Sequence, residues 1–513
     1  MLQSTNEKSR APQRITRRPV RAPALHGGID GVLLVITVPS FVLLALAGLT
    51  DNRAVLIAAL IWVATTSLVR GVHCLLNIEL FSICRLLAAF TVAFQLGGAV
   101  PAHIEYLLTG DLASYAALSV PEPSMAIASY VYVAIYYLAC QLFCEFLSAY
   151  DRKWWQGAMA SLDRNIKRDK HLVTLDTALL LAIGALGAWA VLTGQVGINK
   201  MYFEGGADGS NSIFASLLAI TPQFAVGLAA ALCIRFRSSW FKLAIIVVLT
   251  LPSLLMLFSL GRRPLIFAVV AGATIVLWQL RRRIPVSAVL AFIIAGAPAL
   301  QVVSSFFQAT RTAYHESGGR SEQRSLIDAL SAGNESYAQA AERAFGDFTV
   351  RANSISFIVE IAELMQPEHF TLGWLSFGAF LRNIPSALWP GKVEFTAEFD
   401  KPDFYLMRML GIEIYDAIMP IPALGYAEFG WFGVPASGLS VLALSWCLCW
   451  LSGVGRTVAA PAIAIAAAIN FAFNIEADLT SAISTIRTVA MITLPLAVAA
   501  VLYRGRVTTA TAT

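Results

Sequence analysis

Residues 243–280 read LAIIVVLTLPSLLMLFSLGRRPLIFAVVAGATIVLWQL. Two apolar runs, 243–260 and 264–280, flank a short turn that carries Arg262 and Arg263. Each run is just long enough to cross a bilayer, since about 20 apolar residues in a helix span the hydrocarbon core. This stretch therefore predicts a helical membrane protein with two arginines at a membrane boundary.

Basic residues around this helical hairpin predict its orientation. They are Arg235, Arg237 and Lys242 before the first run, and Arg281, Arg282 and Arg283 after the second. Lys and Arg beside short loops mark the cytoplasmic side of a membrane protein. Two crossings from that side place Arg262 and Arg263 on the outer face. Binding of an anionic group is a physical reason for their breach of the positive-inside bias.

The composition supports this class of protein. The chain is 57% hydrophobic and only 13% charged, with a mean hydropathy of +0.68. Its apolar runs are long and continuous, which favours spanning helices over barrel strands. The net charge of +5 follows from the topological bias and gives no case for nucleic acid binding.

The apolar runs predict an all-α polytopic membrane protein with roughly twelve transmembrane helices. The predicted spans are 30–50, 54–70, 78–100, 124–148, 172–193, 212–234, 243–260, 264–280, 284–307, 425–452, 459–476 and 484–503. The corresponding regions are a basic cytoplasmic tail (1–28), a bundle of about nine helices (29–307), a large periplasmic loop (308–420), about three further helices (421–506) and a cytoplasmic tail (507–513). The basic loop 150–171 falls on the cytoplasmic side, and both termini do as well.

The loop 308–420 is too long to lack structure of its own. Helical periodicity predicts amphipathic helices at Ser325–Ala340 and Glu342–Met365. The segment Trp374–Trp389 is aromatic and apolar, interrupted by Arg382 and Pro385. This mixture is typical of a helix that lies at the membrane interface, with its aromatic rings at headgroup depth.

Arginines of this outer region are the candidate ligands for an anion, because the guanidinium is a planar, permanently charged fork for phosphate oxygens. The strongest candidates are Arg262, Arg263, Arg351 and Arg382, with Arg311 and Lys392 as helpers. Arg320, Arg324 and Arg343 are better explained as salt-bridge partners of the loop's acidic residues. Several arginines that converge could hold a diphosphate without a metal ion.

Two residues are candidate general bases. Glu428 opens a predicted apolar helix, where a carboxylate is costly and desolvation would raise its pKa. The structural alternative is a capping partner at a helix N-terminus. His315 lies one turn from Arg311 and is the second candidate. Tyr426 and Trp389 are candidate sugar platforms or, alternatively, interfacial anchors.

No motif for nucleotide or metal chemistry accompanies these residues. The seven cysteines have no histidine partners at metal-ligand spacing. We therefore expect no metal and no cofactor.

Three stretches together resemble the oligosaccharide repeat unit polymerases, the Wzy-type O-antigen and exopolysaccharide polymerases. They are Gly261-Arg262-Arg263-Pro264, the segment from Arg351 through Trp374 and Arg382 to Trp389-Pro390-Gly391-Lys392, and Gly425-Tyr426-Ala427-Glu428-Phe429-Gly430. The resemblance covers roughly residues 255–435.

The resemblance implies a glycosyltransferase of the bacterial inner membrane with a periplasmic active site. Its donor and acceptor would be polyprenyl-diphosphate-linked oligosaccharides, of the undecaprenyl diphosphate type. Its protein partners to consider are a chain-length regulator and a flippase. The alternatives are a ligase-like glycan transferase and a flippase or transporter of lipid-linked oligosaccharide, which would need a polar path through the bundle.

Overall fold

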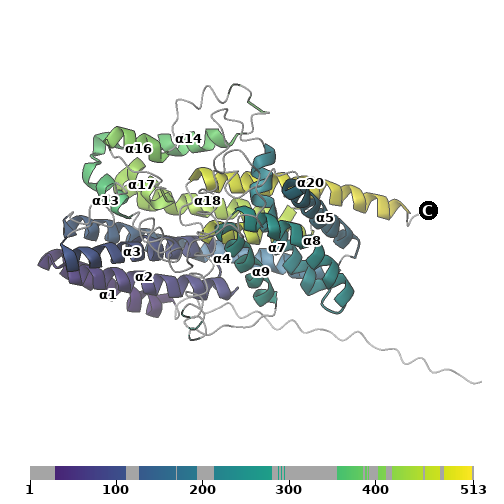
Figure 1. Cartoon of the computed structure of the whole chain (residues 1–513), viewed down its shortest axis with the longest axis horizontal. Helices are drawn as coiled ribbons and strands as arrows, with labels where there is room; N and C mark the ends of the chain where they lie inside the picture. Colours follow the sequence, from purple (N-terminus) through teal and green to yellow (C-terminus); the bar gives the residue numbers. More distant parts are fainter. Residues whose placement is uncertain are drawn as a thin grey trace, which may run out of the picture.

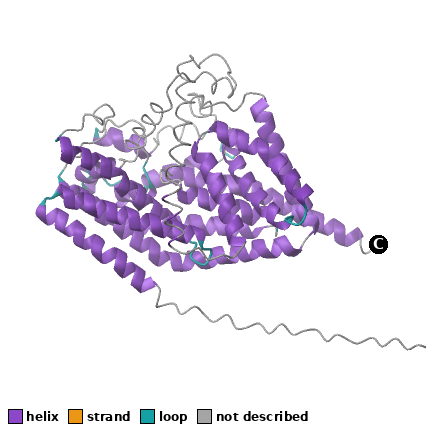
Figure 2. Ribbon diagram, turned by 60° about the horizontal axis from the view of Figure 1, so that its bottom comes forward, coloured by secondary structure: helices purple, strands orange, loops and turns teal. Residues whose placement is uncertain are grey.

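A computed structural model describes residues 29–110, 126–168, 170–192, 213–260, 262–279, 355–384, 388–389, 391, 402–411, 419–454, 457–473 and 479–510, together with 287, 291 and 294. Every regular element in these ranges is a helix, as Figure 2 shows. The all-α prediction is therefore confirmed for this part of the chain.

The N-terminal helices are α1 (Ile29–Thr50), α2 (Arg53–Leu76), α3 (Ile83–Thr109), α4 (Ile127–Arg168), α5 (Lys170–Leu192), α7 (Ile213–Arg235), α8 (Trp240–Leu260) and α9 (Arg262–Gln279). Then follow α13 (Ile355–Leu364), α14 (Trp374–Asn383), α16 (Pro402–Leu410), α17 (Ile421–Phe429), α18 (Gly433–Gly453), α19 (Ala459–Phe473) and α20 (Leu479–Ala510). Figure 1 shows α13, α14, α16 and α17 gathered on one side of the long bundle.

Six helical segments in the described residues are long and apolar enough to cross a membrane. They are α2, α3, α4, α8, α20 and the stretch Ile421–Gly453. Because α17 folds back on α18 within that stretch, only α18, with 21 residues, is the part that can cross. Shorter apolar stretches lie in α1, α5, α7, α9 and α19, at five other predicted spans. The predicted span 284–307 lies outside the continuously described residues. The chain is thus a multi-pass helical protein by the length and composition of its helices.

One hydrophobic cluster shows which ends of the helices lie together. It combines Ala47 from the end of α1, Leu56 from the start of α2, Leu96 from the second half of α3 and Tyr130 from the start of α4. Successive helices contribute opposite ends, as antiparallel neighbours must. Residues of α13, α14, α16 and α17 complete the same cluster. We call this the α13 end of the bundle.

At the opposite end the prediction of a loop at 150–171 is wrong in part, because α4 continues to Arg168. Its buried residues Trp155, Met159, Leu162 and Ile166 recur at helical spacing, so one face packs while Lys153 stays exposed. The basic residues of this segment therefore lie on a helix that prolongs a span.

Two buried aspartates join helices at this opposite end. Asp151 accepts hydrogen bonds from the Ser82 hydroxyl (2.7 Å) and from the backbone N–H of Cys84 (2.9 Å) at the start of α3. Asp176 accepts from the backbone N–H groups of Val458 and Ala459, both at 3.0 Å, at the start of α19. Each carboxylate satisfies N–H groups that a helix start leaves without a partner.

A buried ion cluster holds α2, α3 and α4 together. Glu145 of α4 pairs with Arg70 of α2 (Nη2 to Oε1, 2.6 Å) and with Arg85 of α3 (Nε to Oε2, 2.8 Å). Arg85 also donates to the Ser148 hydroxyl at 3.1 Å. These charges satisfy one another inside the bundle, which gives them a structural role.

The predicted span 425–452 is interrupted, which corrects the sequence interpretation of this region. Gly430 has a φ of 57°, a left-handed conformation that favours glycine, and the chain reverses there between α17 and α18. Gly425 packs against Gly433, and the Ser437 hydroxyl donates to the Ile421 carbonyl at 3.2 Å. These pairings make α17 and α18 an antiparallel hairpin, with its tip at Gly430–Phe432.

Candidate site around helix α14

Among the amphipathic helices described at the α13 end, α14 carries a stripe of exposed aromatic side chains. Leu375, Ala379 and Leu381 are buried against the bundle. Trp374, Phe377 and Phe380 recur at every third position and are 50%, 49% and 56% exposed. The helix gives way to an extended residue, Ile384, directly before Pro385, because proline disfavours helical geometry in the residue before it. An aromatic stripe of this kind suits a helix at headgroup depth.

Glu428 fixes the first turn of α14. Its carboxylate accepts the Ser376 backbone N–H at 2.7 Å and the Ser376 hydroxyl at 2.5 Å, and its side chain is buried. The Leu372 N–H donates to the Glu428 carbonyl at 3.1 Å. A carboxylate at a helix N-terminus satisfies free N–H groups and complements the helix dipole.

This contact corrects the predicted position of Glu428. The residue lies near the end of α17 rather than at the start of a span, and the helix that it caps is α14. Of the two interpretations that the sequence left open, the geometry therefore favours the capping role over the general base.

The last turn of α14 brings two arginines to one place. Arg382 is partly buried on α14, and its neighbour Asn383 donates to the Thr480 carbonyl at 3.0 Å. Arg487 of α20 donates from Nη1 to the Asn383 carbonyl at 3.2 Å. Neither α14 nor α20 contains an acidic residue. Within these two helices the junction thus holds two arginines, while Glu476 and Asp478 directly precede α20 in the sequence.

Arg487 is partly buried, and its guanidinium caps the last turn of α14. A cation gains about 0.3–1 kcal/mol at a helix C-terminus. An arginine at the centre of a membrane span costs about 2.5–3.5 kcal/mol on insertion scales, with less near the interface. Capping of the last turn of α14 therefore offsets part of this cost.

For the other predicted anion ligands, either the structure describes the backbone alone or the residue lies outside the described part of the chain. Arg262 and Arg263 form the first turn of α9, where the backbone is described but the side chains are not. Phe267, one turn later, lies 6.0 Å from Phe473 of α19, and α20 follows α19. The described contacts thus link α9 to α14 through α19 and α20. Arg311, His315, Arg351 and Lys392 lie outside the described residues.

Tyr426 is not an open sugar platform, because it is only 5% exposed. Its ring packs edge to face on Tyr136 (5.1 Å between centroids), and its hydroxyl lies 3.3 Å from that of Tyr132. Trp431, at the tip of the α17–α18 hairpin, packs on Tyr132 and Tyr136 of α4 and is 43% exposed. Trp389 is partly exposed beyond α14.

Sequence reasoning missed several residues of this end. Arg487 was detectable as a lone charge in the apolar run 484–496, and Trp431 as an aromatic residue in a Gly-Trp-Phe-Gly turn. Glu360 of α13 carries a raised pKa because of partial burial and, secondarily, repulsion from Glu363. In the sequence, Glu360 fits a regular amphipathic pattern, so nothing marked it as a candidate functional residue.

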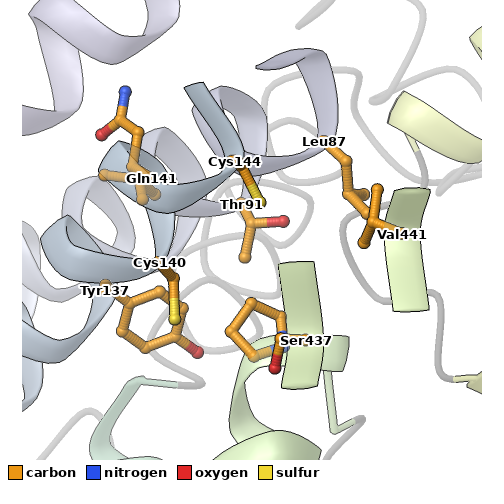
Figure 3. Close-up of a pocket in the computed structure, with 11 residues that line it drawn as sticks. Leu87, Thr91, Tyr137, Cys140, Gln141, Cys144, Ser437 and Val441 are labelled. Carbon is orange, nitrogen blue, oxygen red and sulfur yellow. The ribbon is translucent and has the colours of Figure 1, made fainter. Parts of the chain in front are cut away.

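A small cavity lies between α3, α4 and the α17–α18 hairpin (Figure 3). Thr91, Tyr137, Cys140, Cys144 and Ser437 line it. It has room for about one water molecule, which is far too little for a sugar or a nucleotide. Among the described residues, no group of three or more His, Cys, Asp and Glu side chains is placed to hold a metal ion.

Comparison of the chain with protein-family models, with curated proteins and with solved structures gives no match.

Proposed function

We propose that this protein is an inner-membrane glycosyltransferase that polymerises polyprenyl-diphosphate-linked oligosaccharide repeat units at the periplasmic face. In this proposal the chain crosses the membrane roughly twelve times, both termini are cytoplasmic, and 308–420 is the periplasmic loop. The α13 end of the bundle then faces the periplasm. The resemblance of residues 255–435 motivates the proposal.

The observation that carries it is the arrangement of α14. An exposed aromatic stripe (Trp374, Phe377 and Phe380) runs along the helix, and Arg382 lies in its last turn. Glu428 holds one end of α14 and the α20 junction holds the other. An apolar strip that ends at fixed cations matches an amphiphile whose diphosphate lies at the membrane surface.

The reaction needs little covalent chemistry from the protein. The acceptor hydroxyl oxygen attacks the anomeric carbon of the donor sugar, and the bond from that carbon to the diphosphate oxygen breaks. The electron pair leaves with the polyprenyl diphosphate, whose charge Arg262, Arg263, Arg351 and Arg382 would neutralise, with Arg311 and Lys392 as helpers. Positioning and electrostatic stabilisation then supply most of the rate enhancement.

The proton of the acceptor hydroxyl goes to a base. Because Glu428 is engaged at α14, we assign this role to His315, the second sequence candidate. His315→Gln should slow polymerisation, because the acceptor hydroxyl would lose the group that takes its proton. Unchanged activity in this variant would exclude the assignment.

Reconstitution with purified lipid-linked repeat units tests the function. The proposal expects a ladder of polymers without any second protein. Arg382→Ala and Arg262→Ala should abolish the ladder while the protein still inserts, and Arg408→Ala, an exposed control on α16, should keep it. Transfer of glycan only to a lipid core would identify the ligase, and translocation without elongation would identify the flippase. Full activity of both arginine variants would refute the diphosphate role.

A further inference from the structure

We propose that the turn between α7 and α8 is a binding site for an anionic phospholipid. The turn joins Arg235, the last residue of α7, to Trp240, the first residue of α8. Arg237 in the turn and Lys242 in the first turn of α8 are exposed. Between them lie Trp240 and Phe241, which are 79% and 62% exposed. Two cations beside two exposed aromatic rings match a lipid phosphate at headgroup depth.

Local packing orders this turn. The Ser239 N–H donates to the Phe236 carbonyl at 2.8 Å, which closes the turn. The Lys242 ammonium lies 4.9 Å from the centre of the Phe236 ring, so a cation–π contact holds it against the turn. Arg235 is not assigned to the site, because its charge acts on the buried Asp176 of α5. The site therefore depends on the two exposed cations.

An exposed apolar stripe continues from the turn along α8. Its members follow one another at intervals of three or four residues, so they share one face of the helix. They are Phe241, Ile245, Val248, Leu251 and Leu255, and they are 40–65% exposed. The opposite face is buried, for example at Ile246 and Leu257, where α8 packs on α5, α7 and α9. An acyl chain that lies along the stripe places its phosphate beside the two cations.

Contacts between helices place this turn at the end of the bundle opposite to the α13 end. Asp176 binds the start of α19, and Arg235 lies close enough to Asp176 to act on its charge. Asn165, in the extension of α4, donates to the Thr457 carbonyl directly before α19 at 2.8 Å. The lipid site is thus separate from α14. In the proposed topology it faces the cytoplasmic leaflet, where anionic lipids give the membrane surface a negative potential.

Binding of two phospholipids to the full-length protein in a neutral detergent tests the site. Phosphatidylglycerol has a net negative charge, whereas phosphatidylcholine balances its phosphate with a cation of its own. Native mass spectrometry with both lipids at equal concentration should show preferred retention of phosphatidylglycerol. The double variant Arg237→Gln, Lys242→Gln should weaken phosphatidylglycerol binding by about tenfold, because it removes the charge-assisted contacts to the phosphate. Its binding of phosphatidylcholine should stay within about twofold of the wild type.

A matched control separates a site from a diffuse attraction. The double variant Lys153→Gln, Arg164→Gln removes the same charge from exposed positions on the extension of α4, at the same end of the bundle. It should keep the preference for phosphatidylglycerol, and both double variants should melt like the wild type, because all four side chains are exposed. Equal loss of phosphatidylglycerol in the two double variants would overturn the proposal, and so would equal retention of the two lipids by the wild type. Polymerisation is measured separately, so the proposed function stands in either case.

Discussion

Glu428 reaches from the end of α17 to the first turn of α14 and accepts two hydrogen bonds from Ser376. Glu428→Ala should therefore lower the free energy of unfolding by about 1–2 kcal/mol, the cost of a lost helix cap. Polymerisation should fall with it, because Arg382 depends on α14 for its position. The melting temperature in detergent, measured beside activity, checks both expectations.

A double-mutant cycle with Ser376→Ala distinguishes a cap from a base. For a cap, Ser376→Ala reproduces part of the loss, and the two substitutions together cost less than their sum. A general base would behave differently, since Glu428→Gln would abolish turnover at an unchanged melting temperature and Ser376→Ala would leave turnover intact.

Loss of the Glu145 carboxylate should destabilise the fold more than loss of Glu428, because Glu145 pairs with two arginines. Glu145→Gln leaves Arg70 and Arg85 as buried cations without their carboxylate, a change that costs about 3–5 kcal/mol. We expect a large fall in melting temperature and little folded protein. Glu368→Gln replaces an exposed acid and should be neutral. Equal stability of the two variants would show that the ion cluster does not hold α2, α3 and α4 together.

The α17–α18 hairpin depends on close backbone approach at its glycines. A Cβ at Gly433 would lie 2.2 Å from the Gly425 carbonyl oxygen, and its φ of −61° is ordinary. Gly433→Ala should thus cost about 1–3 kcal/mol by overpacking, with no contribution from backbone strain. Gly453→Ala is the matched control in α18, because nothing lies within 4 Å of its Cβ. Similar melting temperatures for the two variants would argue against the hairpin.

Elements differ in how far the sequence could predict them. Continuous apolar runs specify helices such as α2, α3 and α8, because a helix satisfies every backbone group within one segment. The reversal at Gly430 escaped prediction, because Glu428 is the one charged residue in 421–453 and hydropathy does not register the direction of the chain. The α14 helix was predictable from its aromatic and apolar pattern. Its anchors, Glu428 and Asn383, are distant in sequence and needed the tertiary structure.

For the molecule as a whole, the sequence identifies unusual arginines but does not predict which of them lie together in the fold. Arg382 was found because an arginine in an aromatic segment is unusual. Arg487 lies 105 residues later, and only packing of α20 on α14 brings the two together. Charge pairing is a tertiary property, as the contact of Arg85 with Glu145 also illustrates.

The orientation of the whole bundle decides whether the site can face the periplasm. Asn52 and Leu372 are exposed near the α13 end, whereas Lys153 is exposed on the far part of α4. Single substitutions Asn52→Cys, Leu372→Cys and Lys153→Cys report the side of each position through a membrane-impermeant maleimide, with the native cysteines as the measured background. The positive-inside bias predicts that the first two react in intact spheroplasts and that Lys153→Cys reacts only after permeabilisation. Reaction of Leu372→Cys only after permeabilisation would place the α13 end of the bundle on the cytoplasmic side. In that case α14 could not present Arg382 to a periplasmic lipid diphosphate, and the proposed function would lose its geometry.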